Sequence, residues 1–212
     1  MAVLARWWMI FSRISTMPWM CLQAAIEQIL QEDDALKQES RLLKWQTLKN
    51  SELLNVSFIG TLIASACTGS IQWSSLQTAH WIVSAAWYGT LVFSLMSVMV
   101  AFYLSILLSN FSINPSGPKL LLQTLHRSGN KRKARWGSLF ALQLPLMLLS
   151  YSLIAYVIGL AVMVVQPLWS EPWGDKSLIA IFFLIFLTLS IGGFGAVCQF
   201  IYVQCEEVLE VE

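Results

Sequence analysis

The sequence predicts an all-α membrane protein, a four-transmembrane-helix bundle preceded by a cytosolic amphipathic helix. The chain has 212 residues, of which 57% are hydrophobic and only 12% are charged, whereas ordinary globular domains carry about 25% charged residues. Asp, Glu, Lys and Arg are absent from Leu53 to Pro118, from Gly137 to Ser170 and from Ser177 to Cys205. A membrane helix needs about 20 apolar residues. The first stretch therefore holds two spans, and each of the others holds one.

The residues before the first span form two segments. Residues 1–17 combine two adjacent tryptophans with two arginines, which is typical of a segment lying in the membrane interface. After Pro18, residues 19–50 carry apolar side chains three, four or seven positions apart for most of their length, which predicts an amphipathic helix. This helix has two open interpretations: it binds a partner during coupling or assembly, or it is a solvated helix beside the membrane. The apolar positions are Leu22, Ile26, Ile29, Leu36 and Leu43.

Residues 51–205 form the predicted transmembrane domain. Two short connections link the first span to the second and the third to the fourth, and residues 110–136 form a longer loop between the second and third. An acidic tail, residues 206–212, closes the chain. The predicted spans are 53–71, 81–108, 138–165 and 178–203.

Lysine and arginine are distributed unevenly between the two sides. Loop 110–136 has six bases and no acid, and the first 52 residues hold another six, whereas the two short connections share only Lys176. Because Lys and Arg concentrate in cytosolic loops, the sequence predicts cytosolic N- and C-termini, in a membrane that it does not specify. Anionic lipids on the cytosolic face are the expected partner of the densest basic cluster, in preference to nucleic acid. That cluster is Lys131, Arg132, Lys133 and Arg135.

Catalytic motifs are missing from the sequence. The four cysteines include no CxxC pair, and the two histidines, His80 and His126, fall at predicted membrane interfaces. No side chain that ionises, other than Cys and Tyr, lies within a predicted span, which disfavours a proton relay or a charged transport site. We therefore expect a protein that is not an enzyme and that carries no cofactor and no metal.

The first span has a polar stripe along one side. Its members recur at spacings of four, four, three and four, which places them on one face of a helix. Small hydroxyl residues allow two helices to approach closely and to hydrogen-bond, but they also line aqueous pathways. Both interpretations remain open, helix packing and pore lining. The polar stripe consists of Ser57, Thr61, Ser65, Thr68 and Gln72.

The fourth span contains three glycines within four residues, Gly192, Gly193 and Gly195. Each glycine weakens a helix by roughly 1 kcal/mol relative to alanine. This cluster predicts a kink or a close helix contact, and it is a candidate gating hinge.

The chain resembles a fungal family of four-helix membrane domains to which no activity is assigned. The resemblance follows the juxtamembrane helix leading into SELLNVSFIGTLIASAC, then HWIVSAAWYGTLVFSLMSVMVAFYLSIL, and, after the basic loop, LQLPLMLLSYSLIAYVIGLAVMVV. It covers most of residues 35–203 and implies the same four-span topology.

The chain is also similar in architecture to Orai calcium channels, whose first helix lines the pore after a basic cytosolic extension. In this sequence RLLKWQTLKNSELL precedes the polar first span. Gln72 stands near the outer end of that span, where Orai places a glutamate, so the similarity does not extend to calcium selectivity.

The leading functional prediction is a subunit of a homo-oligomeric passive channel, with the first span facing the axis. The alternative is a non-conducting scaffold or regulatory subunit that binds its partner through helix 19–50.

Overall fold

The computed structural model describes residue 22 and residues 26–32, 34–73, 79–113, 117–127, 130–170 and 172–210. The predicted interfacial segment, residues 1–17, lies outside this part of the chain. Within the described residues four helices are long and apolar enough to cross a membrane. The chain is therefore a multi-pass integral membrane protein, as predicted. The four helices are α2 (Ala35–Ile71), α3 (Trp81–Ile113), α5 (Trp136–Val165) and α7 (Asp175–Glu210).

The predicted all-α fold class is confirmed, with one small addition between α3 and α5. The region predicted as a long loop contains the end of α3, a short helix and a two-stranded antiparallel hairpin. The short helix forms because Leu121 and Leu125 lie one turn apart and are both buried. The smaller elements are α4 (Gly117–Leu125), β1 (His126–Arg127), β2 (Asn130–Ala134) and α6 (Pro167–Ser170).

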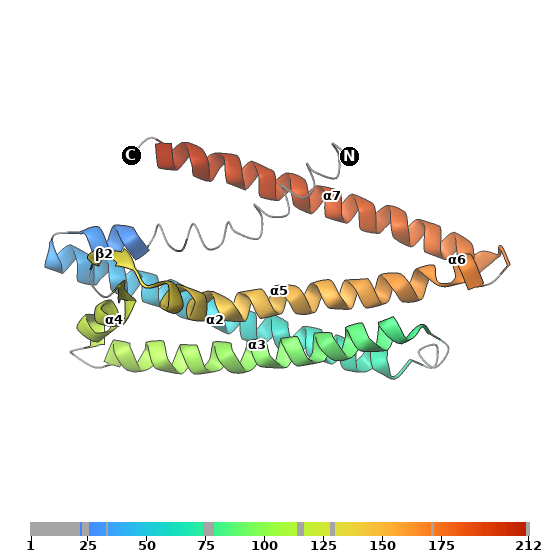
Figure 1. Cartoon of the computed structure of the whole chain (residues 1–212), viewed down its shortest axis with the longest axis horizontal. Coiled ribbons are helices and arrows are strands. Elements are labelled where there is room, and N and C mark those ends of the chain that lie inside the picture. Colours follow the sequence, from blue (N-terminus) through green and yellow to red (C-terminus); the bar gives the residue numbers. More distant parts are fainter. Residues whose placement is uncertain are drawn as a thin grey trace. The chain divides into compact units, whose positions relative to one another are not determined.

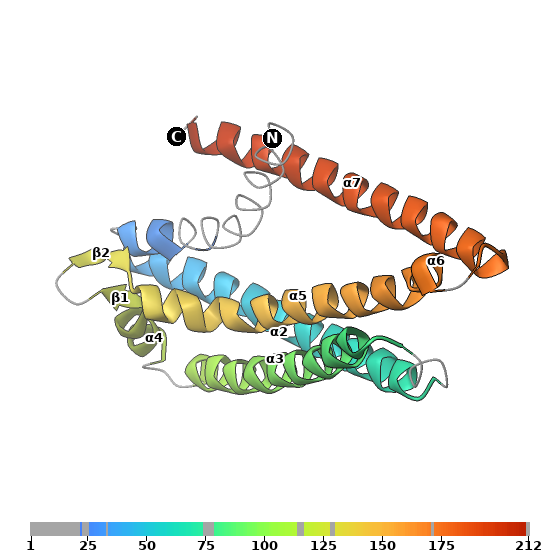
Figure 2. The same cartoon turned by 45° about the vertical axis from the view of Figure 1, so that its right-hand side comes forward.

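The chain divides into two compact units. The three-helix unit, residues 22–163, contains α2, α3, α4, the hairpin and nearly all of α5. The second unit includes the end of α5, together with α6 and α7. Figures 1 and 2 show that α2, α3 and α5 run alongside one another. We call the end with α4, β1 and β2 the hairpin end, and the end where α2 connects to α3 the turn end.

Helix α2 packs against its neighbours through one continuous side, which we call the packing face. At Gly60 the backbones of α2 and α3 come close. A Cβ built there would lie 2.7 Å from Cγ2 of Val98 and 3.4 Å from the carbonyl oxygen of Ser94. The face consists of small and apolar residues three or four positions apart, as helix packing requires. Its members are Leu53, Val56, Gly60, Ala64, Cys67 and Ser70, all buried.

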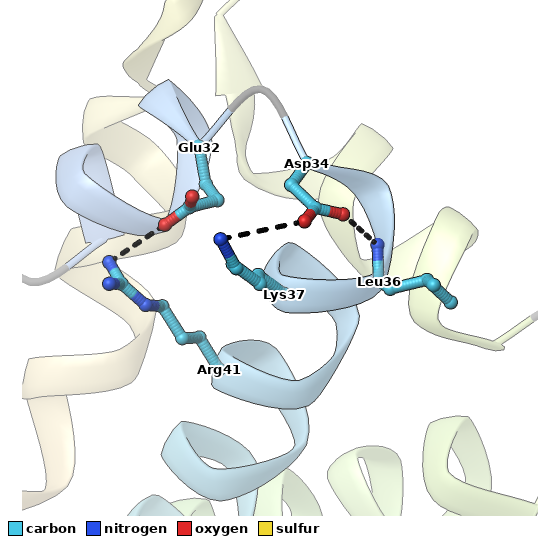
Figure 3. Close-up of polar contacts among 5 residues, drawn as sticks. All are labelled: Glu32, Asp34, Leu36, Lys37 and Arg41. Atoms are coloured by element: carbon cyan, nitrogen blue, oxygen red, sulfur yellow. Dashed lines mark hydrogen bonds and ion pairs between the residues drawn. The ribbon is translucent and has the colours of Figure 1, made fainter.

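The predicted single helix over residues 19–50 is interrupted in the structure. Residues 26–31 are helical, Glu32 and Asp34 are not, and α2 then continues from Ala35 into the first span without a break. The Asp34 carboxylate caps α2 by accepting a hydrogen bond of 3.1 Å from the backbone N–H of Leu36 (Figure 3). Such a cap satisfies one of the otherwise unpaired amides at a helix start. The interruption therefore has a local chemical cause.

Two ion pairs accompany this break. The Arg41 guanidinium lies 3.0 Å from the Glu32 carboxylate, and the Lys37 ammonium lies 3.7 Å from Asp34 (Figure 3). The amide of Gln38 also donates a hydrogen bond to the carbonyl of Ile29. These contacts connect the segment before the break to the first turns of α2.

The hairpin end has its own apolar core. Leucines and isoleucines from residues 22–30 pack in one cluster with leucines of α2, α4 and α5. The apolar residues that suggested a partner-binding helix are therefore largely used within the chain, although Leu36 and Leu43 remain exposed. The buried members at this end are Leu22, Ile26, Ile29, Leu30, Leu42, Leu121, Leu125, Leu139 and Leu142.

Candidate functional site

The polar stripe lies beside the packing face of α2, roughly a third of a turn around the helix. Ser57 is half-buried, whereas Thr61, Ser65, Thr68 and Gln72 are exposed. Within the first span the packing face, and not the stripe, supplies the buried contacts of α2. The stripe is therefore left facing outward from the three-helix unit.

The hydroxyl groups of the stripe are hydrogen-bonded to their own helix. Ser57 donates to the carbonyl of Leu53 at 3.0 Å, and Thr61 donates to the carbonyl of Ser57 at 2.9 Å. Ser65 and Thr68 repeat the pattern toward the residue four positions earlier, at 2.9 and 2.8 Å. Donation in this direction satisfies the proton of each hydroxyl but leaves lone pairs on its oxygen. The stripe therefore presents a row of acceptor oxygens.

A shallow groove of about 560 Å³ runs between the stripe and α3. It exists because α2 contributes only small side chains at this level, while α3 contributes larger aliphatic ones. The lining residues are Thr61, Ala64, Ser65, Thr68 and Gly69 from α2, and Leu91, Leu95 and Val98 from α3.

Buried polar side chains of α3, which the sequence reasoning did not single out, join α3 to α5. The Ser97 hydroxyl donates to the carbonyl of Pro145 at 2.7 Å, and Thr90 Oγ1 lies 3.2 Å from the carbonyl oxygen of Ser152. Thr90, Ser94 and Ser97 are all fully buried. These three residues are spaced four and three positions apart, as in the polar stripe of α2, so the same pattern search would have found them. The spacing does not indicate which of the two polar faces, that of α2 or that of α3, is packed against other helices.

Further hydrogen bonds connect α2 to the other two helices near the turn end. The Cys67 thiol donates to the carbonyl of Trp87 at 3.0 Å, and the hydroxyls of Ser70 and Tyr156 lie 3.0 Å apart. Each pair among α2, α3 and α5 is thus joined by at least one buried or part-buried polar contact.

A second polar cluster lies at the hairpin end, where α2 meets the last turns of α3. Lys49 forms an ion pair of 2.8 Å with Glu52, in which the Lys49 side chain is only 3% exposed and that of Glu52 is 41% exposed. Gln46 donates to the carbonyl of Leu108, and Ser105 donates to Asn50. The sequence did not predict this cluster. Because the first span was expected to begin at residue 53, residues 46–52 were expected to be in water. In the structure they are part of the α2–α3 interface.

The glycines of the fourth span lie in an uninterrupted stretch of α7. A Cβ built on Gly192, Gly193 or Gly195 would meet nothing within 4 Å. A kink, a close helix contact and a gating hinge at these glycines all stay predictions.

The four bases of the predicted lipid site occupy the hairpin and the residue that follows it. Lys131, Arg132 and Lys133 belong to β2, and Arg135 lies between β2 and α5. In the described ranges no group of three or more His, Cys, Asp or Glu side chains is arranged to hold a metal ion.

Comparison with known proteins gave no family model, no curated protein and no solved structure that matches the chain.

Proposed function

We propose that the chain is a subunit of a homo-oligomeric passive pore in which the polar stripe of α2 faces the central axis. The observation that carries the proposal is the placement of the stripe: Thr61, Ser65 and Thr68 are exposed, while the adjacent packing face holds the subunit together. A stripe needed for packing within the subunit would not be available for a pathway.

The chemistry of the stripe supports passage of water or of small polar or cationic solutes. Its back-bonded hydroxyls offer acceptor oxygens, and acceptor oxygens replace part of the hydration shell of a permeating species. No residue of the stripe is ionisable, so it supplies neither a strong ion trap nor a proton relay.

The proposal includes an orientation in which the hairpin end lies in the cytosol. The supporting observation is the location of the bases within the three-helix unit: Lys119 belongs to α4, Arg135 directly follows β2, and Lys44 and Lys49 lie in the part of α2 that precedes the first span. By the preference of Lys and Arg for cytosolic loops, both termini are then cytosolic.

The main rival remains a non-conducting scaffold that uses helix 19–50. Burial of Ile26 and Ile29 in the chain's own core removes part of the apolar surface which that role would use. A second rival uses the stripe and groove only to pack one subunit against another.

Mass measurement of the protein in lipid nanodiscs, combined with solute flux into liposomes, tests the proposal. We expect a closed oligomer and a flux that Ser65→Leu abolishes without changing the oligomer mass, because leucine would produce a dry constriction. The matched control is Ser150→Leu, at an exposed and likewise back-bonded serine of α5. A monomer, or flux that persists in Ser65→Leu, would contradict the pore. Loss of the oligomer in Ser65→Leu would instead favour subunit packing.

A further inference from the structure

We propose that the β1–β2 hairpin is a docking surface for anionic phospholipid headgroups in the leaflet next to the first turn of α5. The proposal depends only on the chain being a membrane protein. It does not depend on the pore.

The hairpin region is strongly basic. Residues 126–135 contain five bases, Arg127, Lys131, Arg132, Lys133 and Arg135, and no acid. Four of these bases fall within five consecutive residues of β2 and its exit. A surface of one sign attracts the opposite charge over about a Debye length, roughly 8 Å at physiological ionic strength.

These bases are followed directly in the sequence by a residue at the membrane boundary. Helix α5 begins at Trp136, directly after Arg135. The Trp136 side chain is 69% exposed, and its ring stacks on Phe140 with centroids 5.7 Å apart. Exposed tryptophan at the start of an apolar helix is typical of the headgroup level. Five residues of extended chain reach at most about 18 Å, so the backbone of Lys131 lies within that distance of Trp136, and Arg135 is its direct neighbour.

The hairpin is attached to the start of the third span by hydrogen bonds and apolar contacts. The backbone N–H of Arg135 donates to the carbonyl of Leu125 at 2.8 Å, which closes the base of the hairpin. The Ser138 hydroxyl in the first turn of α5 donates to the carbonyl of Thr124, also at 2.8 Å. Leu121 and Leu139 belong to the same buried cluster. These contacts hold the basic strand at a fixed height relative to the start of α5, whereas a free loop would have no fixed height.

Anionic phospholipid matches both the positive charge of the hairpin and its position beside the membrane boundary, since it supplies phosphate charge at the depth of the Trp136 ring. Each base near an anionic surface contributes about 1 kcal/mol, which corresponds to about a fivefold change in affinity.

Native mass spectrometry of the full chain, with phosphatidylglycerol or phosphatidylcholine added, measures this preference. We expect the wild type to bind phosphatidylglycerol at least about tenfold more tightly. The triple variant Lys131→Gln, Lys133→Gln and Arg135→Gln should lose that preference. The matched control, Lys37→Gln, Lys44→Gln and Lys176→Gln, removes the same charge from exposed positions outside the hairpin and should keep the preference within about twofold.

A second measurement does not depend on the fold of any variant. Raising sodium chloride on the wild type to about 1 M, where the Debye length is about 3 Å, should reduce the preference for phosphatidylglycerol. Equal affinity of the wild type for the two lipids would overturn the proposal, as would an equal loss in the control variant. Tighter binding of soluble polyglutamate than of phosphatidylglycerol vesicles would also overturn it, in favour of an acidic protein partner. None of these outcomes bears on the pore.

Discussion

The indole ring of Trp87 lies directly against the backbone of Gly159, and only glycine fits there. A Cβ on Gly159 would come within 2.6 Å of both Cδ1 and Nε1 of Trp87. Trp87 is fully buried, and Tyr156 stacks on it with ring centroids 6.2 Å apart. This contact sets how closely α3 and α5 approach near the turn end.

Gly159→Ala should therefore destabilise the protein. Overpacking of a filled site costs about 1–3 kcal/mol, and thermal unfolding in detergent should show a lower midpoint. The matched control is Gly137→Ala in the same helix, where a Cβ would meet nothing within 4 Å. That variant should be neutral or more stable by up to about 1 kcal/mol, because alanine favours helix. Equal midpoints for the two variants would show that the Trp87 contact is not tight.

Ser97→Ala tests the hydrogen bond between α3 and α5. The change removes the donor to the Pro145 carbonyl, a buried contact of 2.7 Å. Hydrogen bonds between membrane helices contribute about 0.6 kcal/mol on average and up to about 1.7, so we expect a loss in that range on unfolding in detergent. Ser150→Ala is the control, since exposed Ser150 donates only within its own helix. If both variants unfold alike, the Ser97 bond contributes nothing to helix association.

The sequence predicted the number of spans and the class of fold because charge-free stretches leave few alternatives. It did not predict which polar stripe is packed. Ser97 on α3 and Ser65 on α2 belong to stripes with similar spacing, yet Ser97 is buried and Ser65 is exposed. Periodicity shows that side chains lie on one face of a helix. Whether that face is buried or exposed depends on the positions of the neighbouring helices.

The buried polar cluster at the hairpin end could not be predicted from the sequence either, because its burial also depends on a neighbouring helix. Lys49 is charged and precedes the apolar stretch, so composition places it in water. Its burial depends on the length of α3, which continues to Ile113 and covers the approach to the first span. The interruption at Asp34 was missed because the apolar repeat continues across it.

The unequal exposure of Lys49 and Glu52 gives an asymmetric prediction. Glu52→Gln leaves a buried ammonium without its carboxylate, whereas Lys49→Met leaves a carboxylate that is 41% exposed and can be hydrated. We expect Glu52→Gln to destabilise by about 1–3 kcal/mol and Lys49→Met by less, in denaturant titrations. The exposed pair of Lys37 and Asp34 serves as the control, and Lys37→Met should change stability by less than about 1 kcal/mol. The reverse order for the two substitutions would show that Lys49 is hydrated.

The proposed orientation predicts where glycosylation acceptors are used. An acceptor with long spacers inserted near Ser75 should receive glycan, because that connection lies on the non-cytosolic side. One inserted near Asn130 should stay unmodified, as should the native Asn110-Phe111-Ser112 sequence. Gel mobility before and after glycosidase treatment gives the result. Glycan near Asn130 or on Asn110 would reverse the orientation.

Cysteine accessibility along α2 tests the role of the polar stripe most directly. Cys21, Cys198 and Cys205 are first replaced by serine, and Cys67→Ser keeps a donor for the Trp87 carbonyl. Single cysteines at Thr61, Ser65 and Thr68 should then react with a charged, water-soluble thiol reagent and reduce flux through liposomes. Cysteines at Ile59 and Leu62, which are exposed and lie on another side of α2 from the centre of the stripe, should not react, because that side faces lipid. If none of the three stripe positions reacts in folded, oligomeric protein, the stripe is dry and does not line a pore.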